Sequence, residues 1–459
     1  MNLFSNIALT PKGWVKNVRV SLDNFGRIAN VESEIERKDK DQYLRDRILL
    51  PALSNLHSHS FQRAIAGLTE KRSMEQDSFW RWRELMYNFI ESLTPEKIHA
   101  ISALVYMEML ECGYVSAGEF HYIHNQKDGK NYSDIAETSY SIINAAQEVG
   151  MGLTILPVFY AGDILNGGKF NKGQIRFINN LDQFLKIIYK VEKALTNAPD
   201  DYSIGIAPHS LRTVPIEFLG EIDNIRSKGP VHMHVAEQLK EVEIIKSNFG
   251  SRPVEWLINN ININSRWCLI HATHMLQNET KNLARSGAVV GLCPITEANL
   301  GDGIFDGREY IISGGKFGIG SDSNVRISLT EELRLLEYSQ RLIRKERNLM
   351  TNTFGSVGSS LFKQVLVGGA QALERDSGSI EVGNWGDLLT LDSKALNFCD
   401  CDEDDFLDRW IFSGDDRLVC EVWSAGRQMV SNGRHIFRDK IERHYRAVIK
   451  DIRNNIAST

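Results

Sequence analysis

Eight short apolar runs, separated by segments with helical periodicity, constrain the fold of this chain more than any other feature. The runs cover residues 48–56, 114–122, 152–160, 203–211, 231–236, 267–274, 288–293 and 317–321. Parallel strands that are covered by helices on both faces are nearly continuously apolar. Because strand and helix alternate eight times, the sequence predicts an α/β fold built around a TIM-type (β/α)8 barrel.

Short alternating runs flank the predicted barrel on both sides along the chain. Residues 14–20, followed by a turn at 23–26, are typical of antiparallel strands, and residues 386–392 and 419–423 have the same character. We expect the two ends to build one small β-sandwich domain, although two separate small domains would give the same pattern. The expected domains are residues 1–50 for the N-terminal part of the small β domain, 51–375 for the catalytic barrel, and 376–459 for the C-terminal part with a C-terminal helix.

The composition favours a protein that acts on a small molecule. Charged residues make up 24% of the chain and the formal net charge is −6, which provides no basic field for nucleic acid and no polybasic membrane patch. No stretch of about 18 apolar residues and no export signal is present. Six scattered cysteines fit a reducing compartment rather than a disulfide framework. We therefore expect a cytoplasmic protein with no nucleic-acid partner and no membrane association.

Histidines gather where the predicted strands end. In a barrel, the active site lies at the C-terminal ends of the strands. A single histidine at such a position is more often a hydrogen-bonded core residue, but the convergence of many at one barrel end favours a metal site. Eight of the twelve histidines in the chain lie on these ends, namely His57, His59, His121, His209, His232, His234, His271 and His274.

One subset of these residues predicts a metal centre. His57 and His59 face the same way, because residues i and i+2 of a strand share a face. Three neutral imidazoles and one carboxylate, with a position left open for water, are the ligands of a catalytic zinc or similar divalent ion. The predicted ligands are His57, His59, His234 and Asp322. His232 shares a strand face with His234, so spacing does not choose between them, and we take His234 because it is nearer the strand end. We expect one divalent ion per chain, with zinc as the expected metal.

Three residues are candidates for catalysis beside this ion. A bound divalent ion lowers the pKa of water from about 15.7 towards 7, which makes a hydroxide available at neutral pH. Glu237 is the expected proton shuttle, because a carboxylate can take a proton from water and pass it to a leaving nitrogen. His271 is expected to orient the hydroxide or stabilise developing charge, and Asp322 to share in activation. The alternative for Glu237 is a residue that complements a helix dipole.

The set His57-x-His59, His234-x-x-Glu237, His271 and Asp322, in this order along a barrel, resembles the mononuclear deaminase branch of the amidohydrolase superfamily. No lysine is placed for carbamylation as in binuclear members, which supports a single ion. Longer stretches resemble the formimidoylglutamate deiminase family within this branch. They are NLHSHSFQRA at 55–64, APHSLR at 207–212, CPITEANLGDG at 293–303 and GSDSN at 320–324.

The resemblance implies a function and a set of substrate contacts. It implies hydrolysis of N-formimino-L-glutamate to N-formyl-L-glutamate and ammonia in histidine degradation, by attack of a metal-activated hydroxide on the formimino carbon. It also implies a homodimer. The two carboxylates of this substrate suit planar arginine side chains, which bind carboxylates in a bidentate manner. Arg81 is an alternative to Arg83. The implied substrate-binding residues are Gln62, Arg83, Tyr122, His209 and Arg212.

A long stretch from Met74 to Leu93, rich in Trp, Phe and Arg, follows the first run and is expected to form a loop that covers the substrate. Two other functions are compatible with the sequence. The same metal site would serve a deaminase of a heterocyclic base or a guanidine compound, which differs only in the pocket. A catalytically inactive barrel that acts as a binding protein is the other alternative, but such barrels usually lose ligands and none is missing here.

Overall fold

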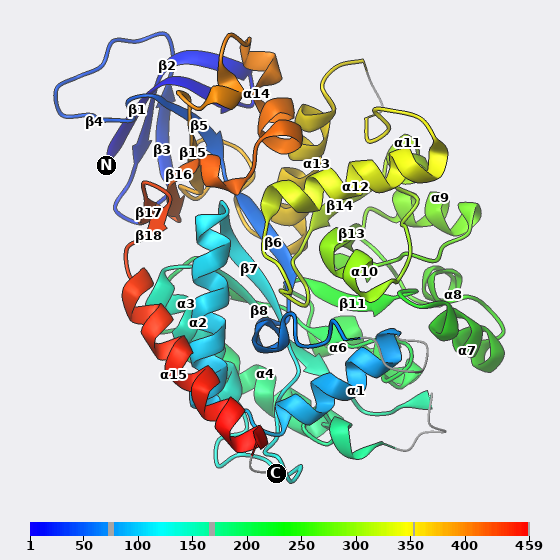
Figure 1. Ribbon diagram of the computed structural model, residues 1–459. Coiled ribbons are helices and arrows are strands. Elements are labelled where there is room, and N and C mark those ends of the chain that lie inside the picture. The colour runs from blue at the N-terminus through cyan, green and yellow to red at the C-terminus, as the bar shows by residue number, and fades with distance from the viewer. Residues whose placement is uncertain (72–77, 165–169, 352–353, 458–459) are drawn as a thin grey trace.

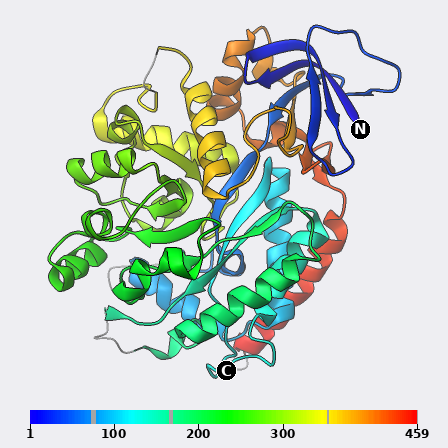
Figure 2. The same cartoon turned by 180° about the vertical axis from the view of Figure 1, so that it is seen from behind.

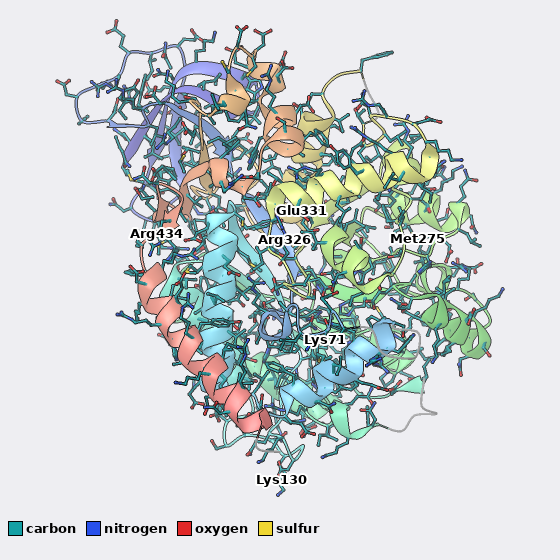
Figure 3. All side chains as sticks on the ribbon, in the orientation of Figure 1. Lys71, Lys130, Met275, Arg326, Glu331 and Arg434 are labelled. Atoms are coloured by element: carbon teal, nitrogen blue, oxygen red, sulfur yellow. The ribbon has the colours of Figure 1, made fainter. Side chains whose placement is uncertain are left out.

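The computed structural model describes residues 1–71, 78–164, 170–351 and 354–457. It confirms the predicted α/β fold, with a (β/α)8 barrel and a smaller β domain to which both ends of the chain contribute (Figure 1). Side chains fill the space between the strands and the surrounding helices, and charged residues such as Lys130 and Arg434 extend from the periphery (Figure 3). Because the interior of the protein is filled in this way, we look for a functional site at the ends of the barrel strands.

The barrel is closed by eight consecutive parallel strand positions in the described part of the chain, the fourth of which is interrupted. Backbone bridges from Ser58 to Asp322 and from Ile206 to Val231 join its two halves. Where the barrel closes, the amide of Asp322 donates a hydrogen bond to the carbonyl of His57. Strands far apart in the sequence therefore end side by side. The strands are β6 (Leu53–Ser58), β7 (Tyr114–His121), β8 (Gly152–Phe159), β9 (Tyr202–Ile204), β10 (Ala207–Pro208), β11 (Val231–Val235), β12 (Trp267–His271), β13 (Val289–Leu292) and β14 (Lys316–Ile319).

The first apolar run is divided between two sheets. Arg47–Pro51 forms β5 of the terminal sheet, and only Leu53–Ser58 forms the barrel strand β6. Between them, the amide of Ala52 donates to the carbonyl of Asp387, 3.0 Å away, where the chain passes from one sheet to the other. The side chains on both sides of this break are almost all buried, so the apolar pattern carries no sign of the change.

Helices cover the outside of the barrel strands (Figure 2). Thr94 caps one of them, α2 (Pro95–Glu111), and accepts a hydrogen bond from the amide of Lys97. Among the described residues, no helix is both long and apolar enough to span a membrane. The helices are α1 (Phe79–Ile90), α2 (Pro95–Glu111), α3 (Glu137–Val149), α4 (Leu181–Leu195), α5 (Ile216–Gly220), α6 (Ile222–Ile225), α7 (Leu239–Phe249), α8 (Pro253–Asn260), α9 (Gln277–Ser286), α10 (Pro294–Leu300), α11 (Gly307–Ile312), α12 (Leu329–Arg344), α13 (Val357–Ala372), α14 (Phe406–Asp408) and α15 (Arg438–Ala457).

The predicted small β-sandwich consists, within the described residues, of nine strands that hydrogen bonding joins into one continuous sheet. The two ends of the chain meet where Leu50 of β5 pairs with Leu389 of β15. Helix α15 then runs back along α2 (Figure 1). The domain boundaries at residues 50 and 375 stay predictions. Besides β5, the strands are β1 (Asn2–Thr10), β2 (Gly13–Leu22), β3 (Ile28–Glu32), β4 (Gln42–Tyr43), β15 (Leu388–Asp392), β16 (Val419–Ser424), β17 (Arg427–Ser431) and β18 (Arg434–His435).

A buried ionic network ties the small β domain to the barrel. Arg375, after α13, donates two hydrogen bonds to Asp387, at 2.7 and 2.9 Å, and one to the backbone carbonyl of Asp201, at 2.9 Å. Arg427 of β17 reaches the Asp201 carboxylate, which precedes β9. The buried Asp387 also accepts from the amide of Ala425. Removing one member withdraws a partner from another buried charge, which is then only partly compensated.

We expect Asp387→Ala to lower the free energy of unfolding by about 3 kcal/mol or more, because truncation of a buried ion pair leaves Arg375 without its closest partner. Urea unfolding followed by circular dichroism measures this change. Asp376→Ala is the matched control, since that carboxylate pairs with Arg27 at the surface, and an exposed pair contributes less than about 1 kcal/mol. Equal losses in the two variants would contradict a structural role for the network.

Candidate metal centre and active site

Four predicted residues meet at the C-terminal end of the barrel. The Nε2 atom of His57 lies 3.1 Å from that of His234 and 3.4 Å from Oδ1 of Asp322, and His59 Nε2 lies 3.3 Å from the same oxygen. All four are buried. In a tetrahedral zinc site with bonds of about 2.0–2.1 Å, two ligand atoms lie about 3.3 Å apart. The spacing of these atoms therefore fits a divalent ion at their centre.

The protonation of the cluster agrees with this fit. Burial lowers the pKa of all three histidines. The pKa of His57 falls below its ordinary value, that of His59 falls to about 3, and that of His234 falls well below its ordinary value. Burial alone would raise the pKa of Asp322, but the neighbouring His57 and His59 hold it below its usual range. His59 is oriented by a contact of 2.9 Å between Nδ1 and the Phe120 carbonyl. Three neutral imidazoles and a carboxylate thus bring four possible ligand atoms around one point.

The two histidines of β11 occupy different depths of the barrel. His232 Nε2 lies 2.7 Å from the carbonyl of Ala372 at the end of α13, away from the cluster. His234, two residues nearer the strand end, contacts His57. The structure therefore separates two side chains that share a strand face and that spacing did not distinguish.

The strand ends at this site carry unusual backbone conformations. Ala236, His271, Ala272 and Asp322 have φ values of 51°, 70°, 48° and 45°, a left-handed region that residues other than glycine seldom adopt. Such strain persists only where surrounding contacts fix it, and it concentrates at functional sites. For Asp322, the contacts come from a buried polar network in which Asn324 donates to the Asp322 carbonyl.

Glu237 and His271 lie beside the cluster. His271 Nε2 is 3.8 Å from Glu237 Oε1 and 3.9 Å from Asp322 Oδ2, and its Nδ1 is 3.2 Å from Oε1 of Glu297. Burial alone would lower the pKa of His271, but the carboxylates of Glu237, Glu297 and Asp322 raise it to about 10. Burial raises the pKa of the Glu237 carboxyl. The pair therefore offers a histidine that holds its proton and a carboxylate that can accept one.

A pocket with about 550 Å³ of empty space opens above the cluster. All predicted site residues line it except His57, which is fully buried. Arg81, the alternative to Arg83, is not among the lining residues. Within it, Gln62 Nε2 donates to the hydroxyl of Tyr122 at 2.9 Å, and Gln62 Oε1 has no hydrogen-bond partner among the described residues. The lining residues are His59, Gln62, Phe79, Trp82, Arg83, Met86, Tyr87, Tyr122, Tyr160, Phe177, His209, Arg212, His234, Glu237, His271, Leu300 and Asp322.

The two predicted arginines differ in their surroundings. Arg212 is only 4% exposed, and its closest carboxylates, those of Glu237 and Glu241, stand 3.8 and 3.9 Å away. Its Nε has no hydrogen-bond partner among the described residues. Arg83 is half-buried and stacks on Trp80 and Tyr87 of its own helix. Arg212 is thus a buried cation with donors to spare at the wall of the pocket.

The sequence analysis did not predict some of the residues that line the pocket. The stretch predicted as a covering loop falls partly outside the described residues, at 74–77, and its later part forms helix α1, which lends Phe79, Trp82 and Tyr87 to the pocket. Tyr160 ends the third apolar run, so the same strand-end argument that selected the histidines would have selected it. Glu241 and Glu297, which contact predicted residues, carry no local signal that separates them from ordinary helical glutamates.

Comparison with known proteins agrees with this fold. The profile of the amidohydrolase family matches residues 48–429, and the chain belongs to this family. It is 42% identical to the formimidoylglutamate deiminase of Pseudomonas aeruginosa over 98% of this chain and 99% of that protein. The crystal structure of an amidohydrolase from Brucella melitensis matches with a TM-score of 0.93 and 42% identity, over 98% and 99% of the two chains. An adenosine deaminase from Xanthomonas campestris, solved with bound zinc, shares the fold at a TM-score of 0.81 and 19% identity, over 99% and 98%.

We expect His234→Ala to lose most of its bound metal, while His232→Ala retains it, because only His234 points its Nε2 at the cluster. Metal content per chain, measured by inductively coupled plasma mass spectrometry after purification without added chelator, checks this. A thermal melt run beside it separates metal loss from unfolding. The reverse pattern, with metal lost only in His232→Ala, would mean that His232, deeper in the barrel, is the metal ligand instead of His234.

Proposed function

We propose that this chain is a formimidoylglutamate deiminase, which hydrolyses N-formimino-L-glutamate to N-formyl-L-glutamate and ammonia in histidine degradation. The observation that carries the proposal is the 42% identity to the Pseudomonas aeruginosa deiminase along nearly the whole of both chains. The pocket supports it, because a buried arginine with free donors stands beside a potential metal centre. We also propose that the protein is a cytoplasmic homodimer. The scattered cysteines fit a reducing compartment, and the resemblance carried by the sequence motifs implies the dimer.

In this proposal His57, His59, His234 and Asp322 hold one divalent ion. Neutral imidazole nitrogens with a carboxylate oxygen are a usual donor set for zinc, which is the proposed metal. When bound, such an ion lowers the pKa of a water molecule towards 7 and so supplies a nucleophile at neutral pH. The support lies in the mutual distances of the four ligand atoms, all within 4.8 Å of one another.

The remaining groups handle protons and charge. Water adds to the formimino carbon, and Glu237 takes one proton from it and delivers that proton to the imino nitrogen. Glu237 then transfers the proton of the new hydroxyl group to the same nitrogen, while the carbonyl of the product forms. The carbon–nitrogen bond then breaks and ammonia departs, which leaves the N-formyl product. The raised pKa of Glu237 suits a group that both accepts and returns a proton near neutral pH. His271, held from behind by Glu297, directs Nε2 into the pocket, where it stabilises the developing charge.

Substrate recognition is assigned to other residues that line the same pocket. Arg212 is proposed to bind one carboxylate through a bidentate, charge-assisted pair, and Arg83 the other. Gln62 and Tyr122, which are hydrogen-bonded to each other, and His209, which directly follows β10, complete the contacts. A heterocyclic substrate would not need a buried cation at this position, and this favours the dicarboxylate.

We expect the purified protein to release ammonia from N-formimino-L-glutamate and to lose this activity on chelation. Adenine, cytosine and guanidino compounds should be poor substrates in the same assay. Glu237→Gln is the matched inactive variant, since it is nearly isosteric, and it should keep its metal while losing at least about a hundredfold in kcat, as for a general acid–base group. A chain that deaminates a heterocycle but not formiminoglutamate would overturn the proposed function.

We expect Arg212→Met to lower kcat/KM for formiminoglutamate by about 30-fold or more, since loss of one partner of a buried charged pair costs about 2–5 kcal/mol. Hydrolysis of a small formamidine that lacks the glutamate portion should change little. Arg83→Met should behave in the same way but less severely, and Arg81→Met, outside the pocket, serves as the control. Equal losses on both substrates would instead assign Arg212 to the support of the metal site.

A further inference from the structure

We propose that Glu241 is a positioning residue that holds the base Glu237 and the substrate-binding Arg212 in place at the same time. The inference rests on the function proposed above, because it extends the roles given there to Glu237 and Arg212. Glu241 belongs to the first turn of α7 and is fully buried. It does not line the pocket, so it acts on the reaction only through its neighbours.

The first contact of Glu241 is with the backbone that carries the base. Its Oε1 accepts a hydrogen bond from the amide of Ala236, at 3.3 Å, and its Oε2 accepts one from the amide of Glu237, at 3.1 Å. Ala236 is the residue in the left-handed conformation that turns the chain out of β11. The carboxylate thus fixes the turn that determines where the side chain of Glu237 points.

The second contact is electrostatic. Oε1 of Glu241 stands 3.9 Å from Nε of Arg212, which is too far for a hydrogen bond. Both Glu241 oxygens already bind backbone amides, so the carboxylate compensates the charge of Arg212 without occupying its N–H groups. A buried guanidinium needs such a charge nearby, yet a carboxylate in direct contact would compete with the substrate for the same donors. The geometry satisfies both requirements.

Removing the charge should disturb both functional residues. Among the described residues, the only other carboxylate within 4 Å of Arg212 is that of Glu237, whose Oε2 lies 3.8 Å from Nη2. Without Glu241, Arg212 attracts Glu237 more strongly and draws it away from His271, whose Nε2 is 3.8 Å from Oε1 of Glu237. The base then leaves its working position and the arginine loses its free donors.

Glu241→Gln tests this role, with Glu243→Gln as the matched control. Glu243 lies on the same helix, is exposed, and undergoes the same change of charge. For formiminoglutamate we expect Glu241→Gln to lower kcat by about tenfold or more and to raise KM by about fivefold or more, with metal content unchanged. Glu243→Gln should stay within about twofold of the wild type in both constants. A wild-type kcat and KM in Glu241→Gln would overturn the proposal.

A second arm separates positioning from simple structural support. In the double variant Glu241→Gln with Arg212→Met, no cation remains to draw Glu237 aside. Its kcat on the small formamidine should therefore recover by about threefold or more relative to Glu241→Gln alone, as for coupled neighbours. A residue that only stabilises the fold would show additive losses and no recovery, and that result would overturn the proposal.

Two further measurements keep the test independent of folding and of the proposed substrate. If Glu241→Gln is insoluble, Glu241→Asp keeps the charge but shortens the reach to the amides, so kcat should fall while KM stays within about twofold. Equal changes in both constants would count against the role.

If the wild type proves inactive on formiminoglutamate, a crystal structure of Glu241→Gln still decides. Glu237 hydrogen-bonded to Arg212 would support the role, and an unmoved Glu237 would refute it.

Discussion

The convergence of four ligand atoms on one buried point is the constraint on which the C-terminal end of the barrel depends. Three uncharged imidazoles and one carboxylate point at a common centre in a buried region, an arrangement that a cation at that centre stabilises. They come from three segments that are far apart in the sequence, at residues 57–59, 234 and 322. The backbone hydrogen bonds that close the barrel between Ser58 and Asp322 bring the first and last of these together. The fold is therefore what makes the cluster possible.

How far the sequence predicts this molecule depends on whether a feature is local. The apolar runs locate the eight barrel strands because burial on both faces leaves a local pattern, and the pairing of His57 with His59 follows from strand geometry alone. The same pattern does not show where residues 48–56 pass from one sheet to the other, because Leu50 and Leu53 are buried alike in both. That distinction depends on the partner strand.

The candidate site divides in the same way. Residues at strand ends could be found because a barrel brings all such ends together, whichever strand they follow. Spacing alone did not choose between His232 and His234, and the prediction of His234 rested on its position nearer the end of the strand. Glu241 and Glu297 were not found, because a glutamate in the first turn of a helix is an ordinary feature. Their significance lies in tertiary contacts with Arg212 and His271.

The terminal sheet has a consequence for how the chain reaches its native state. Strand β5 pairs with β1, close in sequence, but also with β15, which is synthesised more than 300 residues later. During translation, one edge of the N-terminal strands therefore has no partner until the whole barrel has left the ribosome. Unpaired strand edges are sites of intermolecular association, and contacts of long sequence separation form slowly. The sheet that unites the two ends is thus completed only after the barrel has been synthesised, and until then its open edge is accessible to other chains.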